Sequence, residues 1–381
     1  MCNIYLERMR RILQGKPYPL PAITLEEPIY DDLPVRRGRG ARIDPANRFE
    51  PLHFVEDPAA LDEEELRQVR TEYFTDHTKS ILASNESPDT GFTFSINPYR
   101  GCEHGCVYCY ARPSHEYLGF SAGLDFETKI LVKENAPQLL SEAFQRPSWE
   151  PQIVALSGNT DPYQPLERKL EITRRCLEVF LRHRNPVVII TKNHLVTRDL
   201  DILEEMARYN LVRVTLSVTT LRPELVSVME PRTSRPSRRL QAIADLYSRG
   251  VPVAVNVAPV IPGLTDEEIP EILKAASERG AKNASYIIVR LPGPVKELFL
   301  DWIKREFPDR SQKVIHRLED LRGPRLTDSR FGLRMRGEGE WAEMISNLFN
   351  ISCRKFGLNE TYASLSTEHF VRLRHGQSEL F

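Results

Sequence analysis

The sequence predicts an α/β fold in which parallel strands alternate with helices, arranged as a partial barrel of six strand–helix units. Apolar, β-branched runs recur through the middle of the chain, amphipathic helical patterns lie between them, and a polar or glycine-bearing segment follows each run. Ligand sites in parallel α/β folds lie at the carboxyl ends of the strands. We therefore expect these polar segments to line one shared site.

The strands are predicted from short runs rich in valine, isoleucine and leucine, at residues 92–96, 153–156, 187–191, 212–218, 251–257 and 285–289. The segments at their ends read NPYRGC, SGNTDPYQP, TKN, SVTT, NVAPVIPG and VRLPG. Six such units suit either a doubly wound sheet or a partial (β/α) barrel. Polar groups after all six strands favour the ring of a barrel over the single crevice of a doubly wound sheet.

Three helices are predicted between these strands from apolar spacing and end signals. Residues 199–210 place their apolar side chains on one face. Ser234 opens a second helix and Gly250 ends it. Thr265 and Glu268 form a capping box before a third helix, which Gly280 ends.

The regions that flank the repeating units differ from them in composition. Eight prolines fall within the first 60 residues, where only residues 62–74 have a helical pattern. We accordingly expect an irregular N-terminal extension at residues 1–90, a core barrel at 91–292 and a helical C-terminal extension at 293–381.

Composition and charge are those of a globular protein and argue against a membrane partner. Residues of hydrophobic type make up 41% of the chain, yet no apolar run is long enough to cross a bilayer. The first residues carry charges where a signal peptide has its apolar core, which predicts a cytoplasmic protein without a membrane partner. A net charge of −1 gives no general attraction to nucleic acid, so any polyanion site must be a local patch.

The cysteines are distributed unevenly, with Cys102, Cys106 and Cys109 within eight residues of the sequence. Cys176 and Cys353 lie in helical patterns and are predicted to be small core residues. Thiolates at C-x3-C-x2-C suit zinc or an iron–sulfur cluster. Three ligands on a four-iron cube leave one iron open for chemistry, whereas an electron-transfer cluster normally has a fourth cysteine. A zinc site would need His104 as its fourth ligand, and C-x-H-x-C crowds the ligands.

The cysteine spacing, with the aromatic Tyr108 before the third cysteine and a strand before the first, resembles the radical S-adenosylmethionine (SAM) superfamily. The resemblance implies a [4Fe–4S] cluster held by Cys102, Cys106 and Cys109. It also implies that the open iron chelates SAM, whose reductive cleavage yields a 5′-deoxyadenosyl radical that abstracts a substrate hydrogen. A low-potential electron donor such as flavodoxin or ferredoxin would supply the electron, and Tyr108 would pack near the adenine.

The order and spacing of SGNTDPYQPLE, TKN, SVTT and MEPRTSRP further resemble the spore photoproduct lyase-like branch, over residues 92–292. Carried over by position, the resemblance gives Thr160 a contact with the amino group of SAM and Lys192 one with its carboxylate or ribose. It places Ser217 near the ribose and Arg232 near the carboxylate. These groups can hydrogen-bond or pair with a zwitterionic ligand. Asp161 has the alternative role of capping the helix that follows.

One position departs from the lyase proper. In that enzyme a cysteine before the corresponding turn returns a hydrogen atom to the product radical, and here the position is Gly158. Tyr108 and Tyr110 flank the third cluster cysteine and are candidates to relay a hydrogen atom instead. The terminal regions resemble those of uncharacterised bacterial proteins that are described as DNA repair photolyase-like by analogy alone.

Basic residues form three groups along the chain, and they leave nucleic acid open as a substrate. The groups are Arg36, Arg37, Arg39 and Arg42; Arg232, Arg235, Arg238 and Arg239; and Arg322, Arg325, Arg330, Arg334 and Arg336. Charge runs are more often solvated surface than binding sites. Two functions remain open at this stage, a radical SAM enzyme with an unidentified substrate and a non-catalytic iron–sulfur redox sensor. Polar groups after every strand favour the enzyme, because a sensor needs no ligand ring.

Overall fold

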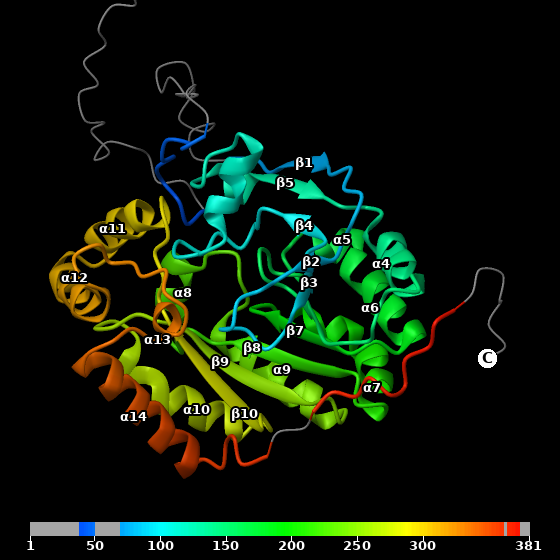
Figure 1. Ribbon diagram of the computed structural model, residues 1–381. Helices are drawn as coiled ribbons and strands as arrows, with labels where there is room; N and C mark the ends of the chain where they lie inside the picture. Colours follow the sequence, from blue (N-terminus) through cyan, green and yellow to red (C-terminus); the bar gives the residue numbers. More distant parts are fainter. Residues whose placement is uncertain (1–37, 50–68, 362–363, 374–381) are drawn as a thin grey trace, which may run out of the picture. The chain divides into compact units, whose positions relative to one another are not determined.

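The computed structural model describes residues 38–49, 69–361 and 364–373, and its main sheet contains six parallel strands (Figure 1). These are β3 (Phe94–Ile96), β6 (Val154–Leu156), β7 (Val187–Thr191), β8 (Val212–Ser217), β9 (Val253–Val260) and β10 (Asn283–Ile288). They follow one another across the sheet in the order of the sequence. A doubly wound sheet would reverse this order at a switch point. The predicted partial (β/α) barrel is therefore confirmed and the doubly wound alternative is wrong.

The sheet is open, because β10 lies at one edge and β2 (Ala83–Ser84), antiparallel to β3, lies at the other. Its central strands are almost wholly apolar and buried; every residue of β9 is buried. This is the pattern of a parallel sheet covered on both faces. Helices α7 (Leu200–Arg208), α9 (Pro236–Ser248) and α10 (Ile269–Ser277) pack along it from β8 to β9 (Figure 1). Helices α4 (Ala136–Gln145) and α6 (Ile172–His183) pack on each other beside them.

The three predicted helices are confirmed, but the capping box is not. The helix expected at 199–210 is α7, which the 3-10 turn η4 (His194–Asp199) precedes. Gly250 follows α9 with φ of +72°, and Gly280 follows α10 with φ of +99°. The Thr265 hydroxyl accepts the amide of Ile261 at 2.9 Å. The Glu268 carboxylate binds the Thr220 hydroxyl at 2.7 Å. Both side chains are thus used between loops, and neither caps η5 (Asp266–Glu268).

A second, smaller sheet lies over the beginning of the barrel. It has the order β1-β5-β4, with β1 (Glu72–Thr75) parallel to β5 (Lys129–Val132) and β4 (Tyr99–Arg100) antiparallel to it. A helix was predicted at residues 62–74, of which 62–68 lie outside the described residues. Over residues 72–74 the prediction is wrong, because Glu72–Thr75 forms a strand that pairs with β5. The segment EYFT contains aromatic and β-branched side chains that favour a strand once a partner is present.

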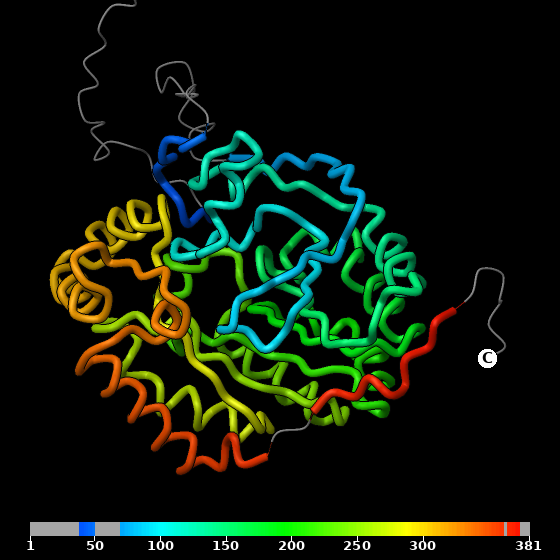
Figure 2. The backbone as a smooth tube through the Cα atoms, in the orientation of Figure 1, coloured from blue at the N-terminus to red at the C-terminus, as the bar shows by residue number. Residues whose placement is uncertain are grey.

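The C-terminal region is helical, as expected, up to residue 355. It contains α11 (Val295–Glu306), α12 (Pro308–Arg322), α13 (Leu333–Arg336) and α14 (Glu340–Lys355), which packs on α10. The Val371 amide donates to the His183 carbonyl at 2.8 Å, so residues 364–373 run across the end of α6 (Figure 2). Short elements complete the described chain: η3 (Arg112–Leu118), α3 (Asp125–Thr128), α5 (Glu167–Leu170) and α8 (Pro223–Met229). The boundaries at residues 91 and 293 stay a prediction. Within the described residues, every helix is too short or too polar to cross a bilayer.

Candidate active site

The three clustered cysteines lie in a loop between the two sheets. The chain leaves β3 at Ile96, forms β4 and enters the loop at Gly101, whose φ is +77°. A side chain at Gly101 would meet the His115 ring at 3.0 Å, so the tight turn requires glycine. Cys102 and Cys106 are buried and Cys109 is half-buried. The loop therefore holds three thiols close together, at the carboxyl edge of the parallel strands.

Backbone amides of the loop and its neighbours act on two of the thiols. The amides of His104 and Asp161 lower the pKa of the Cys102 thiol, and those of Ala111 and Arg112 lower that of Cys109. Burial outweighs these contributions and raises the pKa of all three thiols. Three buried thiolates would thus need positive charge at the sulfurs, and amide donors to sulfur are a feature of iron–sulfur sites. The donor set, three thiols in one loop, has the chemistry that the predicted [4Fe–4S] cluster requires of its ligands.

His104 is held by protein groups and does not face the thiols as a fourth ligand. Its Nδ1 lies 3.5 Å from the Asp161 carboxylate, and its Nε2 lies 3.2 Å from the Asn193 side-chain amide. Burial lowers the pKa of His104 to about 4, so the ring is neutral. The geometry at His104 gives the zinc alternative no support.

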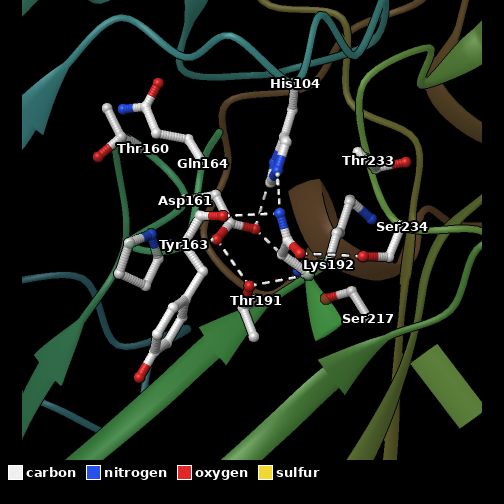
Figure 3. Close-up of polar contacts among 12 residues, drawn as sticks. His104, Thr160, Asp161, Tyr163, Gln164, Thr191, Lys192, Ser217, Thr233 and Ser234 are labelled. Atoms are coloured by element: carbon white, nitrogen blue, oxygen red, sulfur yellow. Dashed lines mark hydrogen bonds and ion pairs between the residues drawn. The ribbon is translucent and has the colours of Figure 1, made fainter. Parts of the chain in front are cut away.

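Asp161 joins the cysteine loop to the ends of β6 and β7 (Figure 3). Its carboxylate accepts the Tyr163 amide at 2.9 Å, the Thr191 hydroxyl at 2.6 Å and the Lys192 amide at 2.8 Å, besides facing His104. The alternative role of helix cap is wrong, since these partners lie in a turn, a strand end and the cysteine loop. Asp161 thus positions His104 of the cysteine loop against the end of β7.

The turn after β6 is shaped by Asn97, which the sequence analysis missed. The Asn97 side-chain oxygen accepts the amides of Asn159 and Thr160 at 2.9 and 3.2 Å. The Thr160 hydroxyl donates to the Tyr99 carbonyl at 3.4 Å, just before the first cysteine. Gly158 has φ of +125°, which an L side chain rarely adopts. Thr160 is therefore buried beside the cysteine loop, as its predicted role requires.

A buried carboxylate, Glu230, gathers the side chains around Lys192. The Tyr108 hydroxyl donates to Glu230, and the Arg239 guanidinium pairs with it. The Lys192 ammonium lies 3.4 Å from Glu230 and donates to the Ala258 carbonyl at 2.8 Å. Burial, with the charge of Arg239, lowers the pKa of Lys192 to about 8. Glu230 thus brings together two of the predicted ligand residues, Tyr108 and Lys192. The sequence analysis did not single out Glu230, and its place in the segment MEPRTSRP is the one signal that could have suggested it.

The other predicted SAM contacts lie on the same edge. Ser217 ends β8 and is buried, and its carbonyl accepts from the Arg239 guanidinium at 3.1 Å. Arg232 pairs with Glu103 in the cysteine loop at 3.2 Å, and its amide donates to the His104 carbonyl at 3.3 Å. Each predicted residue therefore contacts, directly or through one partner, the cysteine loop or the strand ends around it.

Tyr110 is the more accessible of the two candidate catalytic tyrosines. Its side chain is 49% exposed, whereas Tyr108 is 6% exposed. The Tyr110 hydroxyl donates to the Gly158 carbonyl at 2.6 Å, and the Arg290 guanidinium lies 5.4 Å from its ring centre. The structure thus brings Tyr110 to Gly158, which the sequence analysis matched by resemblance to the cysteine position of the lyase.

Residues 38–49, which we call the strap, cover the cysteine loop. The Glu127 carboxylate accepts the amides of Gly40 and Ala41 at 3.0 and 2.8 Å and pairs with Arg112 at 2.5 Å. A Cβ at Gly40 would lie 1.8 Å from the Gly105 carbonyl oxygen, so the strap and the loop touch backbone to backbone. Arg39, predicted in a basic patch, donates to the Glu127 carbonyl at 2.9 Å and is structural; Arg36 and Arg37 lie outside the described residues.

His115, beneath the loop, gives a pH dependence that can be measured. Its Nε2 lies 2.9 Å from the Lys129 carbonyl, and its buried Nδ1 has no partner in the described chain. Burial lowers its pKa to about 4. The unfolded chain, with an ordinary histidine pKa, therefore takes up this proton first, and stability is lost as pH falls from about 6.5 towards 4.

We expect His115→Gln, which keeps a donor for Lys129, to remove this loss. Urea unfolding measures the free energy of unfolding of both proteins at about pH 7 and about pH 5. The decrease between these two pH values should be smaller in the variant than in the wild type, by roughly 1–2 kcal/mol. Equal falls in the two proteins would show that His115 does not titrate in this range.

Comparison with known proteins agrees with this geometry. The family model described as the Radical SAM superfamily matches residues 96–276. An uncharacterised protein of Mycobacterium tuberculosis (strain H37Rv) is 36% identical over 254 residues, which cover 65% of this chain and 74% of the relative. The chain belongs to the radical SAM superfamily. An uncharacterised protein of Methanocaldococcus jannaschii is 28% identical to this radical SAM protein over 184 residues, covering 48% of this chain and 66% of that one.

The fold of this radical SAM protein is also found among solved structures. Spore photoproduct lyase complexed with dinucleoside spore photoproduct superposes with a TM-score of 0.53 at 15% identity, covering 77% of this chain and 81% of the lyase. At this identity the likeness shows the fold. The resemblance to the spore photoproduct lyase-like branch is thereby confirmed at the level of architecture.

Proposed function

We propose that this chain is an enzyme that binds a [4Fe–4S] cluster through Cys102, Cys106 and Cys109 and uses SAM to abstract a hydrogen atom from its substrate. One observation carries the proposal: three free thiols lie in one loop, which contacts the strand-end residues Thr160 and Arg232. When bound, the cluster and SAM would supply a 5′-deoxyadenosyl radical, with the electron from a donor such as flavodoxin or ferredoxin. Superfamily membership supports both cofactors.

The protein's own contribution is to hold and orient SAM. We assign Lys192 to its carboxylate or ribose, because the ammonium is fixed by Glu230 and the Ala258 carbonyl. Thr160 would meet the amino group, Ser217 the ribose, Arg232 the carboxylate, and the Tyr108 ring would pack near the adenine. Tyr108 is anchored through its hydroxyl on Glu230, and its ring lies beside the Lys192 ammonium, 5.6 Å from the ring centre.

The later half of the reaction is proposed to differ from that of spore photoproduct lyase. Gly158 offers no thiol, and a cysteine there would have to adopt a strained backbone at φ of +125°. We assign the hydrogen-atom role to Tyr110, which is half-exposed and bonded to the Gly158 carbonyl, with buried Tyr108 as its relay partner. A nucleic-acid lesion stays one candidate substrate, since a neighbour of the same fold binds a dinucleoside lesion. A cytoplasmic location is part of the same proposal.

Anaerobic reconstitution tests the proposal directly. We expect about four irons per chain, as in cysteine-ligated cubes. Dithionite and SAM should then release 5′-deoxyadenosine, measured by liquid chromatography. A fully reconstituted protein that releases none would instead support the alternative of a non-catalytic iron–sulfur redox sensor.

A further inference from the structure

Arg322 is a buried guanidinium with most of its hydrogen-bonding capacity unused. It is the last residue of α12 and is buried, with 6% relative exposure. Its Nη2 donates to the Ile288 carbonyl at 3.2 Å, at the end of β10. Its Nε and Nη1 have no partner among the described residues. Buried charges in proteins are normally paired, so these two free donors indicate a missing anion.

A second guanidinium lies at the same strand end. Arg290 follows β10 by two residues and is half-buried, with its guanidinium 5.4 Å from the centre of the Tyr110 ring. Its one described hydrogen bond is weak, from Nη1 to the Met335 sulfur at 3.7 Å. Burial lowers the pKa of both guanidinium groups, and a neighbouring positive charge lowers it further: that of Arg290 for Arg322, and that of Arg334 for Arg290. Positive charge is therefore concentrated beside Tyr110.

The carboxylates near these arginines already have other partners. Asp89 accepts the Gly332 amide at 2.6 Å and pairs with Arg334. Asp328 pairs with Arg330 at 2.6 Å. Within the described chain, neither Arg290 nor Arg322 forms an ion pair. Asp328 acts on Arg322 and Asp89 on Arg290 only from beyond ion-pair distance, so both guanidinium groups keep hydrogen-bond donors that are free in the part of the chain that the structure describes.

We propose that Arg290 and Arg322 bind a phosphate group of the substrate, next to Tyr110. Guanidinium groups present fixed donors that match the oxygens of a phosphate, and they remain charged when buried. The site lies at the carboxyl edge of β10, and its Arg290 guanidinium lies 5.4 Å from the ring centre of Tyr110, whose hydroxyl is bonded to the Gly158 carbonyl. This inference rests on the proposed function, since it names the substrate as a phosphate ester.

Binding of inorganic phosphate to the reconstituted full chain tests the site without turnover. Thermal unfolding with increasing phosphate, against chloride at equal ionic strength, should give a saturable rise in Tm, because a ligand that binds the folded state stabilises it. Arg290→Gln and Arg322→Met should each weaken the affinity about tenfold or more, as loss of a charge-assisted bond predicts. The matched control is Arg279→Gln, at an exposed arginine after α10, which should bind phosphate as the wild type does.

The stability of Arg322→Met provides a second readout. Removal of an unpaired buried charge should leave Tm, measured without phosphate, equal to the wild-type value or higher. A markedly lower Tm would show that the guanidinium is paired within the chain and would overturn the site. If Arg322→Met fails to fold, Arg290→Gln, at a half-buried position, decides the question: wild-type affinity for phosphate in that variant overturns the site. Wild-type affinity for phosphate in both variants would also refute it.

Two probes identify the source of the phosphate. If the phosphate belongs to a polynucleotide, a single-stranded oligodeoxynucleotide should bind more tightly than thymidine monophosphate. Its affinity for the wild type should fall steeply as the salt concentration increases, and its affinity for Arg290→Gln should fall less steeply. If it belongs to a small ester, the monophosphate should bind as tightly as the oligonucleotide. Failure of both probes to compete with phosphate would contradict a substrate role. Release of 5′-deoxyadenosine, assayed in the same preparations, reports separately on the proposed function.

Discussion

Replacing Cys106 with alanine is expected to remove the iron–sulfur cluster, while replacing Cys353 with alanine should leave it intact. Cys106 is the middle of the three loop thiols, and two remaining ligands cannot hold a cube that already has one open iron. Iron and sulfide should fall from about four of each per chain to near zero, and release of 5′-deoxyadenosine should stop.

Cys353 is a suitable control because it is also buried and free. It lies in α14, where its sulfur accepts a weak hydrogen bond from Asn359 at 3.7 Å, and it packs in the main apolar core. Its loss removes a sulfur from the core without touching the loop. Circular dichroism should show that both variants fold. Full iron content in Cys106→Ala would refute the ligand assignment.

Gly40→Ala should displace the strap and destabilise the protein by about 2–5 kcal/mol. The added methyl group would lie 1.8 Å from the Gly105 carbonyl oxygen, which belongs to the backbone of the cysteine loop and cannot turn away. Moving the strap breaks the two amide bonds to Glu127 and leaves its buried pair with Arg112 without those donors. Urea unfolding under anaerobic conditions measures the loss.

The same substitution should expose the cluster. We expect reconstituted Gly40→Ala to lose its iron in air several times faster than the wild type does. The loss is measured by visible absorbance. Gly91→Ala is the matched control, because no atom lies within 4 Å of its Cβ position, and its free energy of unfolding should change by less than about 0.5 kcal/mol. Unchanged stability and unchanged cluster lifetime in Gly40→Ala would show that the strap does not seal the loop.

Local patterns in the sequence were sufficient to predict the strands and the cysteine loop. All six strands were expected within a few residues, because buried parallel strands are continuous apolar runs whose pattern does not depend on their neighbours. The loop was predictable for a similar reason, since three thiols in eight residues form one chemical group whatever surrounds them. Pairing across the chain was not predictable: Glu72–Thr75 becomes a strand only because β5 lies beside it.

The basic residues show most clearly what the sequence alone could not resolve. Arg239 was predicted in a possible phosphate patch, yet it is fully buried and pairs with Glu230. Arg322 was grouped with Arg330, which is ion-paired, although Arg322 itself is buried without an ion pair in the described chain. Charge in a sequence does not reveal which carboxylate a guanidinium meets, because the fold decides which charged side chains are buried together. Glu230 and Asn97 were missed for the same reason.

The pairing of β1 with β5 bears on which part of this chain can fold alone. The family model begins at residue 96, but β5 pairs along its whole length with Glu72–Thr75, and Glu127 takes two of its donors from the strap. A shortened chain that starts at the matched segment would expose the edge of β5 and leave part of the cysteine loop without its cover. The segment that marks this protein as a family member is therefore smaller than its autonomous folding unit.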